Sequence, residues 1–397
     1  MVAITAATPV APFAAHPQHL EAGLWEAVGK ASHILEPNSL CVICRKPLLD
    51  EDCPQVSDVD LLSIYEKPEE YPERITVDAS IGRVFVDILW IPVSAMLDPV
   101  EAASYKTLPH LLLESETVWM RSADLITPLI DRIKHKAYEK AVWMRRIGNQ
   151  INFGDAAIQE AWKNLDFPPA TLFFLQTAHS YYITALADCL KHSSMSILTR
   201  PITKLRRMAT EIGRPELEQL IRANLYLDRK PSASIYALDR VYGAVSARCD
   251  NRQLQGVSAR TRGHYIYTVS PLELKYREAV ADALIRRHDY ANANFYLRFW
   301  SYSISRCPVV LEEARQGRKP SFYVPFRAFK ESVQATCPEI LDDMKVILSG
   351  GEELTQGDAE ESINGTSVFR QTIVEEIRGR GLALPTIREE VAAGRRG

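Results

Sequence analysis

Three aspartates near the start of the chain have the type and spacing to hold a divalent metal ion. Asp58 and Asp60 stand in the segment Ser57–Leu62, and Asp87 stands in the segment Val84–Trp90. Alternate side chains of a β-strand share a face, so Asp58 and Asp60 are expected to point the same way. Asp87 interrupts an apolar segment, where a carboxylate usually meets a cation or a hydrogen-bond donor. Three carboxylates from two neighbouring strands form an all-oxygen site that suits Mg²⁺.

Each of these aspartates also has a simpler interpretation. An Asp-x-Asp pair at the end of a strand is often part of a solvated turn. The face that carries Asp87 is then only half covered, and its carboxylate meets water. The apolar neighbours Val86 and Ile88 favour a buried strand in the middle of a sheet, and with it the metal site.

The same residues resemble the DNA polymerase β-type nucleotidyltransferases. Proteins of that family carry Asp-x-Asp on one strand and a third Asp, between hydrophobic residues, on a later strand. Here Ser57–Leu62 matches the first pattern and Val86–Ile88 the second, and the resemblance covers roughly residues 20 to 100. It implies an α+β fold, in which a small mixed-sheet nucleotidyltransferase domain precedes a larger all-helical domain. That layout is most similar to the aminoglycoside and other small-molecule nucleotidyltransferases.

One element of the family pattern is replaced in this chain. The family has a Gly-Ser turn before the first Asp, where the glycine lets the backbone approach the triphosphate at a helix N-terminus. This chain reads Cys44-Arg45-Lys46-Pro47 there. Arg45, Lys46 and Ser57 are the candidate nucleotide-binding residues, and the first two must bind phosphate in another way or not at all.

The resemblance implies a Mg²⁺-dependent transfer of a nucleoside monophosphate from a nucleoside triphosphate, expected to be ATP, to a hydroxyl group. Asp58 and Asp60 would hold Mg²⁺ on the triphosphate, and Asp87 would join them at a second ion beside the acceptor. The expected acceptor is a small molecule, in antibiotic modification or in natural-product biosynthesis. The alternatives are a transferase that adds AMP to a protein, like the antitoxin members, and a degenerate domain that binds a nucleotide or a partner without turnover.

The charge around the motif bears on the acceptor. Between Asp50 and Glu73 the chain has nine carboxylates and a single basic residue, Lys67. Such a segment repels nucleic acid and suits a cationic or neutral small molecule, although a solvated acidic loop explains it equally well. The net charge of −3 and the pI near 6.3 give no general attraction to nucleic acid, so RNA tailing ranks last.

Two groups of basic residues are candidates to hold the triphosphate in place of the Gly-Ser turn. They are Arg132, Lys136 and Lys140 in one helical segment, and Arg200, Lys204, Arg206 and Arg207 in another. A solvated helix face accounts for each group more simply. His179 lies within an apolar helix face, which is typical of a core histidine rather than a catalytic one.

The elements that position the aspartates are expected to be strands. Leu40–Cys44 reads as a short strand, and Ile75–Val77 pairs with Arg83–Ile91 as a hairpin around Ser80-Ile81-Gly82. On a strand Cys41 and Cys44 face opposite sides, which favours buried apolar cysteines over a zinc pair. Pro92 ends the sheet because it lacks a backbone donor, and we expect no strands after about residue 100.

The rest of the chain reads as helical. We expect a flexible arm over residues 1–18, the nucleotidyltransferase-like domain over 19–105, a helical domain over 106–345 and a loosely ordered tail over 346–397. A capping box at Ser270–Glu273 predicts a long helix running towards Arg306. Its aromatic cluster is expected to lie in the core or at the interface of a homodimer. It comprises Phe295, Tyr296, Phe299, Trp300 and Tyr302.

Composition indicates a cytoplasmic protein with no membrane partner. No apolar run reaches the 18 residues or so of a membrane span. Residues 1–29 contain no Lys or Arg, whereas a secretory signal begins with basic residues and a transit peptide is rich in arginine. The seven cysteines are an odd number without a framework, which is typical of reduced thiols.

Overall fold

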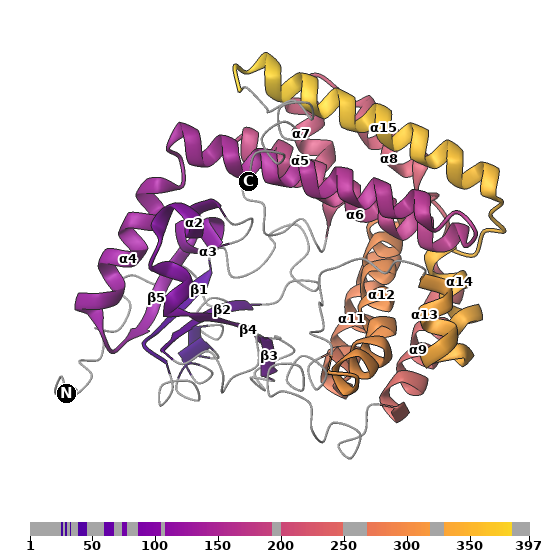
Figure 1. Ribbon diagram of the computed structural model, residues 1–397, viewed down its shortest axis with the longest axis horizontal. Helices are drawn as coiled ribbons and strands as arrows, with labels where there is room; N and C mark the ends of the chain where they lie inside the picture. The colour runs from indigo at the N-terminus through magenta and orange to yellow at the C-terminus, as the bar shows by residue number, and fades with distance from the viewer. Residues whose placement is uncertain are drawn as a thin grey trace.

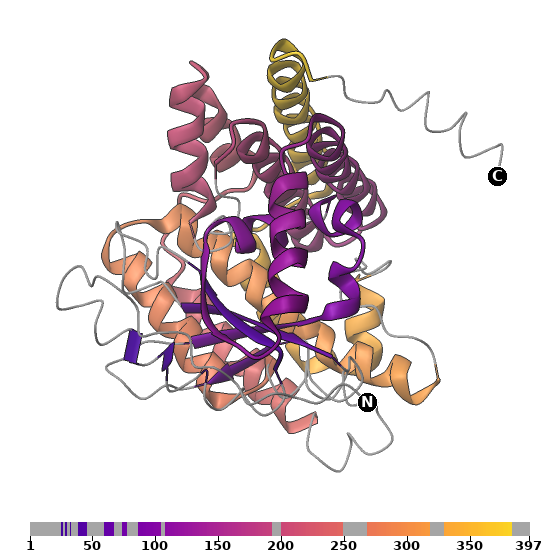
Figure 2. The same cartoon turned by 90° about the vertical axis from the view of Figure 1, so that its left-hand side faces the viewer.

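The protein combines one small mixed β-sheet with a larger set of helices, which agrees with the predicted α+β fold class. A computed structural model describes residues 25–26, 28–29, 32, 39–45, 59–66, 74–77, 86–104, 108–192, 200–248, 268–317 and 329–382. The side chains of Asp87, Leu272 and residues 74–77 are not among those described. In Figure 1 the strands lie to the left of the orange helices α11 and α12. Figure 2 views the molecule from that left-hand side, so the sheet overlaps these helices in the picture.

The sheet has five strands in the order β3-β4-β2-β1-β5. Their bounds are β1 Cys41–Arg45, β2 Val59–Tyr65, β3 Arg74–Val77, β4 Val86–Pro92 and β5 Ser115–Met120. The central pair, β2 and β4, is parallel, and the other three pairings are antiparallel. The predicted pairing of Ile75–Val77 with the segment around Asp87 is confirmed by β3 and β4, while the predicted turn at Gly82 lies outside the described residues.

Apolar residues cover both faces of the sheet. One face carries Val42, Cys44, Leu61 and Ile88, which pack against Val28 of the N-terminal helical residues. The other face carries Cys41, Ile43, Leu62, Ile64 and Ile91, which pack against apolar residues of α2, α3 and α4. Their bounds are α2 Pro99–Ser104, α3 Leu108–Leu113 and α4 Ala123–Lys136. Cys41 and Cys44 are buried on opposite faces, as predicted.

The prediction that strands end at about residue 100 is wrong. β4 does end at Pro92, but β5 lies beyond α3 and pairs with β1 over the register Arg45↔Ser115 to Cys41↔Met120. The physical reason is the free edge of β1, whose backbone groups need partners that a local pattern does not reveal. The sheet therefore includes a segment past residue 105.

The remaining helices form one large hydrophobic core. Their bounds are α5 Lys140–Lys163, α6 Pro168–Cys189, α7 Pro201–Glu211, α8 Glu216–Asn224, α9 Ser232–Arg248, α11 Pro271–Arg286, α12 Tyr290–Arg315, α13 Phe329–Thr336, α14 Leu341–Ser349 and α15 Gln356–Gly379. Single 3₁₀ turns precede α2 at Val93–Met96 and α14 at Pro338–Ile340. α5 and α6 pack against each other as an antiparallel pair, which runs across the upper part of Figure 1. Gly154 lies at their crossing, where a Cβ atom would overlap the ring of Tyr182.

The predicted single helix from Ser270 to Arg306 is two helices. Ser270 does cap the first, because its hydroxyl accepts a hydrogen bond from the Glu273 backbone N–H at 3.1 Å. This helix, α11, ends at Arg286, His288 adopts a left-handed backbone with φ 59°, and Asp289 caps α12. In the aromatic cluster Phe295, Tyr296 and Tyr302 are buried, so the core alternative is confirmed for these three.

The expectation of a loosely ordered tail over 346–397 is wrong for the part of it that the structure describes. α14 ends at Ser349, and α15 then runs from Gln356 to Gly379, packed against α6 and α8. Thr355 and Asp358 form a reciprocal capping box at the start of α15. Gly365 does not break the helix: a Cβ there would overlap the Asn224 side chain, so glycine permits the close approach of α15 to α8.

A buried polar cluster joins the sheet-bearing part to the helices. Asp188 on α6 is fully buried. Its Oδ1 lies 2.7 Å from Nε2 of His110 on α3. Both of its carboxylate oxygens accept a hydrogen bond from Nε of Arg146 on α5, each at 3.1 Å. Arg146 Nη1 also donates to the carbonyl of Ala103 on α2 at 2.8 Å. The cluster fixes α2 and α3 against α5 and α6. Among the helices that the structure describes, none is long and apolar enough to cross a membrane.

Candidate functional site

Asp60 lies at the start of β2, on the face of the sheet covered by α2, α3 and α4. The strand alternates so that Asp60 shares that face with Leu62 and Ile64. Every other residue of β2 is buried, whereas the Asp60 side chain keeps 22% of its surface exposed. Asp60 is thus the one polar and partly solvated position of an otherwise buried central strand.

The register of the sheet brings Asp87 beside Asp60. β2 and β4 run parallel, and Asp60 is the residue directly paired with Asp87. Paired residues of neighbouring strands have their side chains on the same face of a sheet. Of the sequence-predicted metal ligands, the structure therefore places two as neighbours on adjacent strands. Asp58, together with Ser57 and Lys46, lies outside the described residues.

Arg45, the last residue of β1, forms ion pairs with two carboxylates at this edge. Its Nη1 lies 3.3 Å from Asp60 Oδ2, and its Nε lies 3.2 Å from Glu114 Oε2. The β1–β2 register accounts for the first contact, because Cys44 pairs with Leu61 and the next position brings Arg45 opposite Asp60. All three side chains are mostly buried, with 13–23% of their surface exposed.

Glu114 is the residue of this group that the sequence interpretation missed. It stands between α3 and β5, and its backbone N–H donates to the His110 carbonyl at 3.1 Å. Its place beside Arg45 depends on the pairing of β5 with β1, which the sequence did not predict. Arg45 was expected to contact phosphate; here it binds carboxylates, and its role towards a nucleotide stays a prediction.

The residues present fit a hard cation in chemistry. The Asp60 carboxylate has oxygens of the kind that Mg²⁺ prefers, and the strand register places the backbone of a second aspartate, Asp87, beside it. Asp60 already has a positively charged partner in Arg45. Among the residues whose side chains the structure describes, no group of three His, Cys, Asp or Glu could hold a metal ion.

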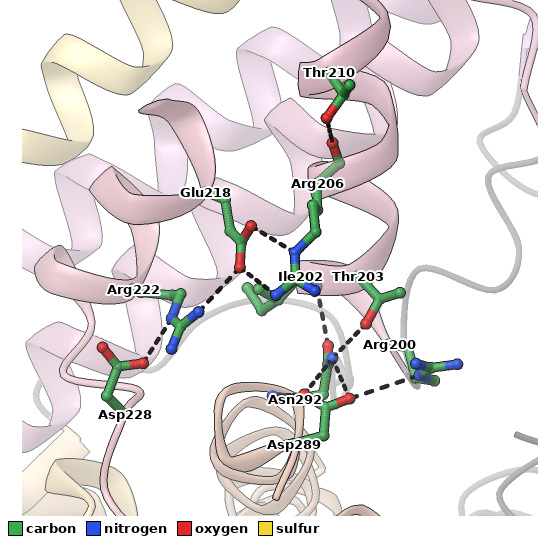
Figure 3. Close-up of polar contacts among 10 residues, drawn as sticks. All are labelled: Arg200, Ile202, Thr203, Arg206, Thr210, Glu218, Arg222, Asp228, Asp289 and Asn292. Atoms are coloured by element: carbon green, nitrogen blue, oxygen red, sulfur yellow. Dashed lines mark hydrogen bonds and ion pairs between the residues drawn. The ribbon is translucent and has the colours of Figure 1, made fainter. Parts of the chain in front are cut away.

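The two basic groups are engaged in helix packing and surface pairs. In the first group, Lys136 pairs with Glu139 at 2.5 Å and Arg132 Nε donates to the Pro128 carbonyl within its own helix. Figure 3 shows the second group: Arg206 forms a two-point pair with Glu218 of α8, and Arg200 pairs with Asp289 at the start of α12. These contacts support the interpretation of helix faces rather than a triphosphate site.

His179 on α6 is a core residue, as predicted. It is fully buried, its Nε2 lies 3.0 Å from the Thr366 hydroxyl of α15, and its ring packs edge-on against Phe369. Burial lowers the pKa of His179 to about 3, because the charged imidazolium would lose its water. The side chain is thus neutral and structural at physiological pH.

The site therefore consists of Asp60 and the neighbouring position of Asp87, with Arg45 and Glu114 beside them. It lies at the edge where β2 and β4 begin and β1 ends. The resemblance to nucleotidyltransferases implies aspartates on two neighbouring strands, and the positions of Asp60 and Asp87 lie on such a pair of strands. When the chain is compared with protein-family models, with curated proteins and with solved structures, nothing matches it.

Proposed function

We propose that the protein is a Mg²⁺-dependent nucleotidyltransferase that moves a nucleoside monophosphate from a nucleoside triphosphate to a hydroxyl group of a small molecule. The observation that carries the proposal is the direct pairing of Asp60 with Asp87 on parallel strands. Two like charges side by side in a sheet are unfavourable unless a cation neutralises them. Residues 19–105 with the added strand β5 would form the nucleotidyltransferase domain, and most of 106–345 the helical domain.

Asp60 and Asp87, with Asp58, would hold the metal ion. Bound there, Mg²⁺ would neutralise charge on the triphosphate and make an acceptor hydroxyl more acidic. The protein's own residues then position the reactants. Asp60 is held by the central strand of the sheet, and Arg45 and the next residue in the sequence, Lys46, are the candidates to contact phosphate. The carboxylates between Asp50 and Glu73 would select a cationic or neutral acceptor.

A second function is favoured by one specific contact. Arg45 stands where the family has its Gly-Ser turn, and it forms an ion pair with Asp60. A domain in which an arginine permanently neutralises the metal-binding aspartate would bind a nucleotide or a partner protein without turnover. The two functions differ in a measurable way, because an active site binds the triphosphate more tightly when Mg²⁺ is present and releases pyrophosphate.

The experiment that tests the proposal is a transfer assay with the full-length protein. Labelled nucleoside triphosphates and Mg²⁺ are incubated with a panel of hydroxyl-bearing small molecules and with proteins, and pyrophosphate release and labelled product are followed. We expect a labelled small molecule. A labelled protein would identify the AMP-transferring alternative, and metal-independent nucleotide binding without pyrophosphate would identify the non-catalytic one.

Two matched variants sharpen the assay. Asp87→Asn should lower turnover more than it lowers nucleotide binding, because the second ion acts at the acceptor. Glu375→Gln removes an exposed carboxylate from α15, which the proposal gives no part in binding, and should leave transfer unchanged. Equal rates for the wild type and Asp87→Asn would show that Asp87 has only a structural role.

A further inference from the structure

The side chain of Lys191 lies over two aromatic rings at the end of α6. Its ammonium nitrogen is 5.2 Å from the centre of the Trp143 ring and 5.6 Å from the centre of the Tyr138 ring. Both are distances of a cation–π contact, in which the electron-rich face of a ring attracts a positive charge. Tyr138 precedes α5 and Trp143 lies in its first turn, so the two rings form a site for one positive charge.

The two rings are positioned by contacts that do not involve the ammonium. Trp143 is half-buried, and its indole N–H donates a hydrogen bond to the carbonyl of Asp188 at 2.8 Å. Tyr138 follows Ala137, which is fully buried and whose carbonyl accepts a hydrogen bond from Arg146 at 3.0 Å. The Tyr138 side of the site is open to solvent, because this residue keeps 37% of its surface exposed.

Lys191 matches the charge of this site but not its hydrogen-bonding chemistry. Its ammonium has three N–H donors, and the described residues offer them no ion pair and no hydrogen bond. A ring face attracts the charge but accepts an N–H hydrogen bond only weakly. A methylated ammonium carries the same charge without these donors, so it loses less hydration between the rings. The site thus suits a methylated ammonium better than the lysine that it holds.

The end of α6 does not itself require a lysine at position 191. Lys191 has a φ of 58°, in the left-handed region where glycine is the usual residue after a helix. The hydrogen bonds of this helix end join backbone groups: Lys191 N–H donates to the Asp188 carbonyl at 3.1 Å, and His192 N–H to the Ala187 carbonyl at 2.8 Å. The two rings are therefore the partners that the lysine side chain gains there.

The helix ends around the site favour a positive charge. α4 ends at Lys136 and α6 ends at Cys189, each within two residues of a side chain of the site. The C-terminal end of a helix carries partial negative charge, and its N-terminal end carries partial positive charge. Two C-terminal ends thus meet one N-terminal end, that of α5, at this site. The balance favours a cation, whether it belongs to Lys191 or to a ligand.

We propose that Tyr138 and Trp143 form a binding site for a small molecule that carries a methylated ammonium group, and that Lys191 occupies this site while the ligand is absent. Neither Asp60 nor a metal ion takes part, so the site is independent of the proposed function. Each ring contributes about two- to fivefold to the affinity for a cation at an exposed site. Because ordering the Lys191 side chain offsets part of this gain, removing it should strengthen ligand binding by about three- to tenfold.

The test titrates the full-length protein with choline at constant ionic strength and follows the N-methyl signal of choline by proton NMR. Methyl groups held over ring faces shift upfield, so the signal reports the place of binding as well as the affinity. Lys191→Gly removes the competing ammonium at a position that favours glycine, and it should bind choline about three- to tenfold more tightly than the wild type. Lys345→Ala removes a lysine of α14 that pairs with Asp342, and it should bind choline as the wild type does.

The roles of the ring and of the charge are tested in the Lys191→Gly background. Tyr138→Leu removes one ring face and should weaken choline binding by about two- to fivefold, whereas Tyr138→Phe keeps the ring and should leave it unchanged. The uncharged analogue 3,3-dimethylbutan-1-ol has the shape of choline, and it should bind about five- to thirtyfold more weakly because both ring faces lose their cation.

Three results would overturn the proposal. Equal choline affinity of the wild type and Lys191→Gly would show that Lys191 does not compete for the site. Equal binding of choline and its uncharged analogue, or an unchanged affinity after Tyr138→Leu, would show that the rings do not recognise a cation. Tighter binding of a short peptide with a trimethylated lysine would reject the small molecule and assign the site to a modified protein.

Discussion

Two aspartates in this protein each meet an arginine, and their surroundings differ. Asp188 is fully buried, its carboxylate receives the Arg146 and His110 side chains, and it joins three helices. Asp60 keeps part of its surface exposed, and its contact with Arg45 is longer and shared with Glu114. The same pair of residue types is therefore fully buried in one region and partly exposed to solvent in the other.

The different burial of Asp188 and Asp60 predicts that one affects the stability of the fold and the other the chemistry of the candidate site. A buried carboxylate whose acceptor sites are filled by protein donors has none left for a ligand, and breaking its contacts leaves a charge without compensation. The Asp60 side chain, where β2 begins, keeps 22% of its surface exposed, so solvent offsets part of the cost of altering it. We expect variants of the Asp188 region to change the free energy of unfolding and variants of the Asp60 region to change catalysis.

The largest expected effect is that of Asp60→Asn on transfer. The rate of pyrophosphate release should fall by about a thousandfold or more, the scale for losing one preorganised charge in an active site. The free energy of unfolding should change by less than about 1 kcal/mol, because Arg45 keeps Glu114. The transfer assay measures the rate, and chemical denaturation measures the free energy of unfolding. A transfer rate within tenfold of the wild type would contradict the assignment of Asp60 as a metal ligand.

Asp188→Asn should have the opposite profile. It should lower the free energy of unfolding by about 3–5 kcal/mol, because Arg146 stays buried without a charged partner. The matched control is Asp155→Asn, because the partner of Asp155, Arg370, keeps 26% of its side chain exposed to solvent. Asp155→Asn should lower the free energy of unfolding by clearly less than Asp188→Asn does. Equal losses for the two variants, measured by guanidinium denaturation, would show that burial does not set the difference.

Gly154→Ala tests the packing of the helical region. The new Cβ would overlap the buried Tyr182 ring at the α5–α6 crossing, so we expect a loss of about 1–3 kcal/mol in the free energy of unfolding. Gly243→Ala, on α9 with nothing within 4 Å of its Cβ position, should instead stabilise by about 0.5–1 kcal/mol through helix propensity. Thermal midpoints of the two variants should move in opposite directions.

A further expected effect is a dependence of stability on pH that comes from His179. Its pKa is about 3 when folded and 6.5 ordinarily, so below pH 6.5 the unfolded chain binds a proton that the folded chain refuses. This contribution to stability is complete above pH 6.5 and is lost as the pH falls towards 3, by about 1–2 kcal/mol between pH 8 and pH 5. Denaturation of His179→Gln should show a shallower dependence of the free energy of unfolding on pH in this range than that of the wild type.

The strands around the candidate site could be predicted because their signals are local. β1, β2 and β4 are short apolar segments bounded by turns, and their pairing brings Asp60 and Asp87 together. β5 could not be predicted in this way, since Ser115–Met120 is a strand only because β1 offers a free edge. The contact of Arg45 with Asp60 follows from the antiparallel register of β1 and β2, so predicting it requires that register in addition to the two strands.

The helical region shows where local signals mislead. Gly365 suggested a loose tail, but a glycine also permits two helices to approach closely, and the partner Asn224 is distant in sequence. The break between α11 and α12 occurs at His288, which adopts a left-handed backbone conformation. A glycine at this position would have indicated the break in the sequence, because glycine is the usual residue in that conformation. In both cases the deciding contact or backbone angle is set by tertiary packing, which no short window of sequence contains.

The strand β5 also determines where this chain can be divided. It covers one side of β1, whose residues Cys41–Cys44 are completely or almost completely buried. A polypeptide cut at residue 105 would lack β5 and would present the unpaired edge of the apolar strand β1 to other molecules. Such edges template intermolecular pairing, so a fragment ending there would self-associate, whereas one ending after Met120 would keep β1 paired and β5 as the edge strand.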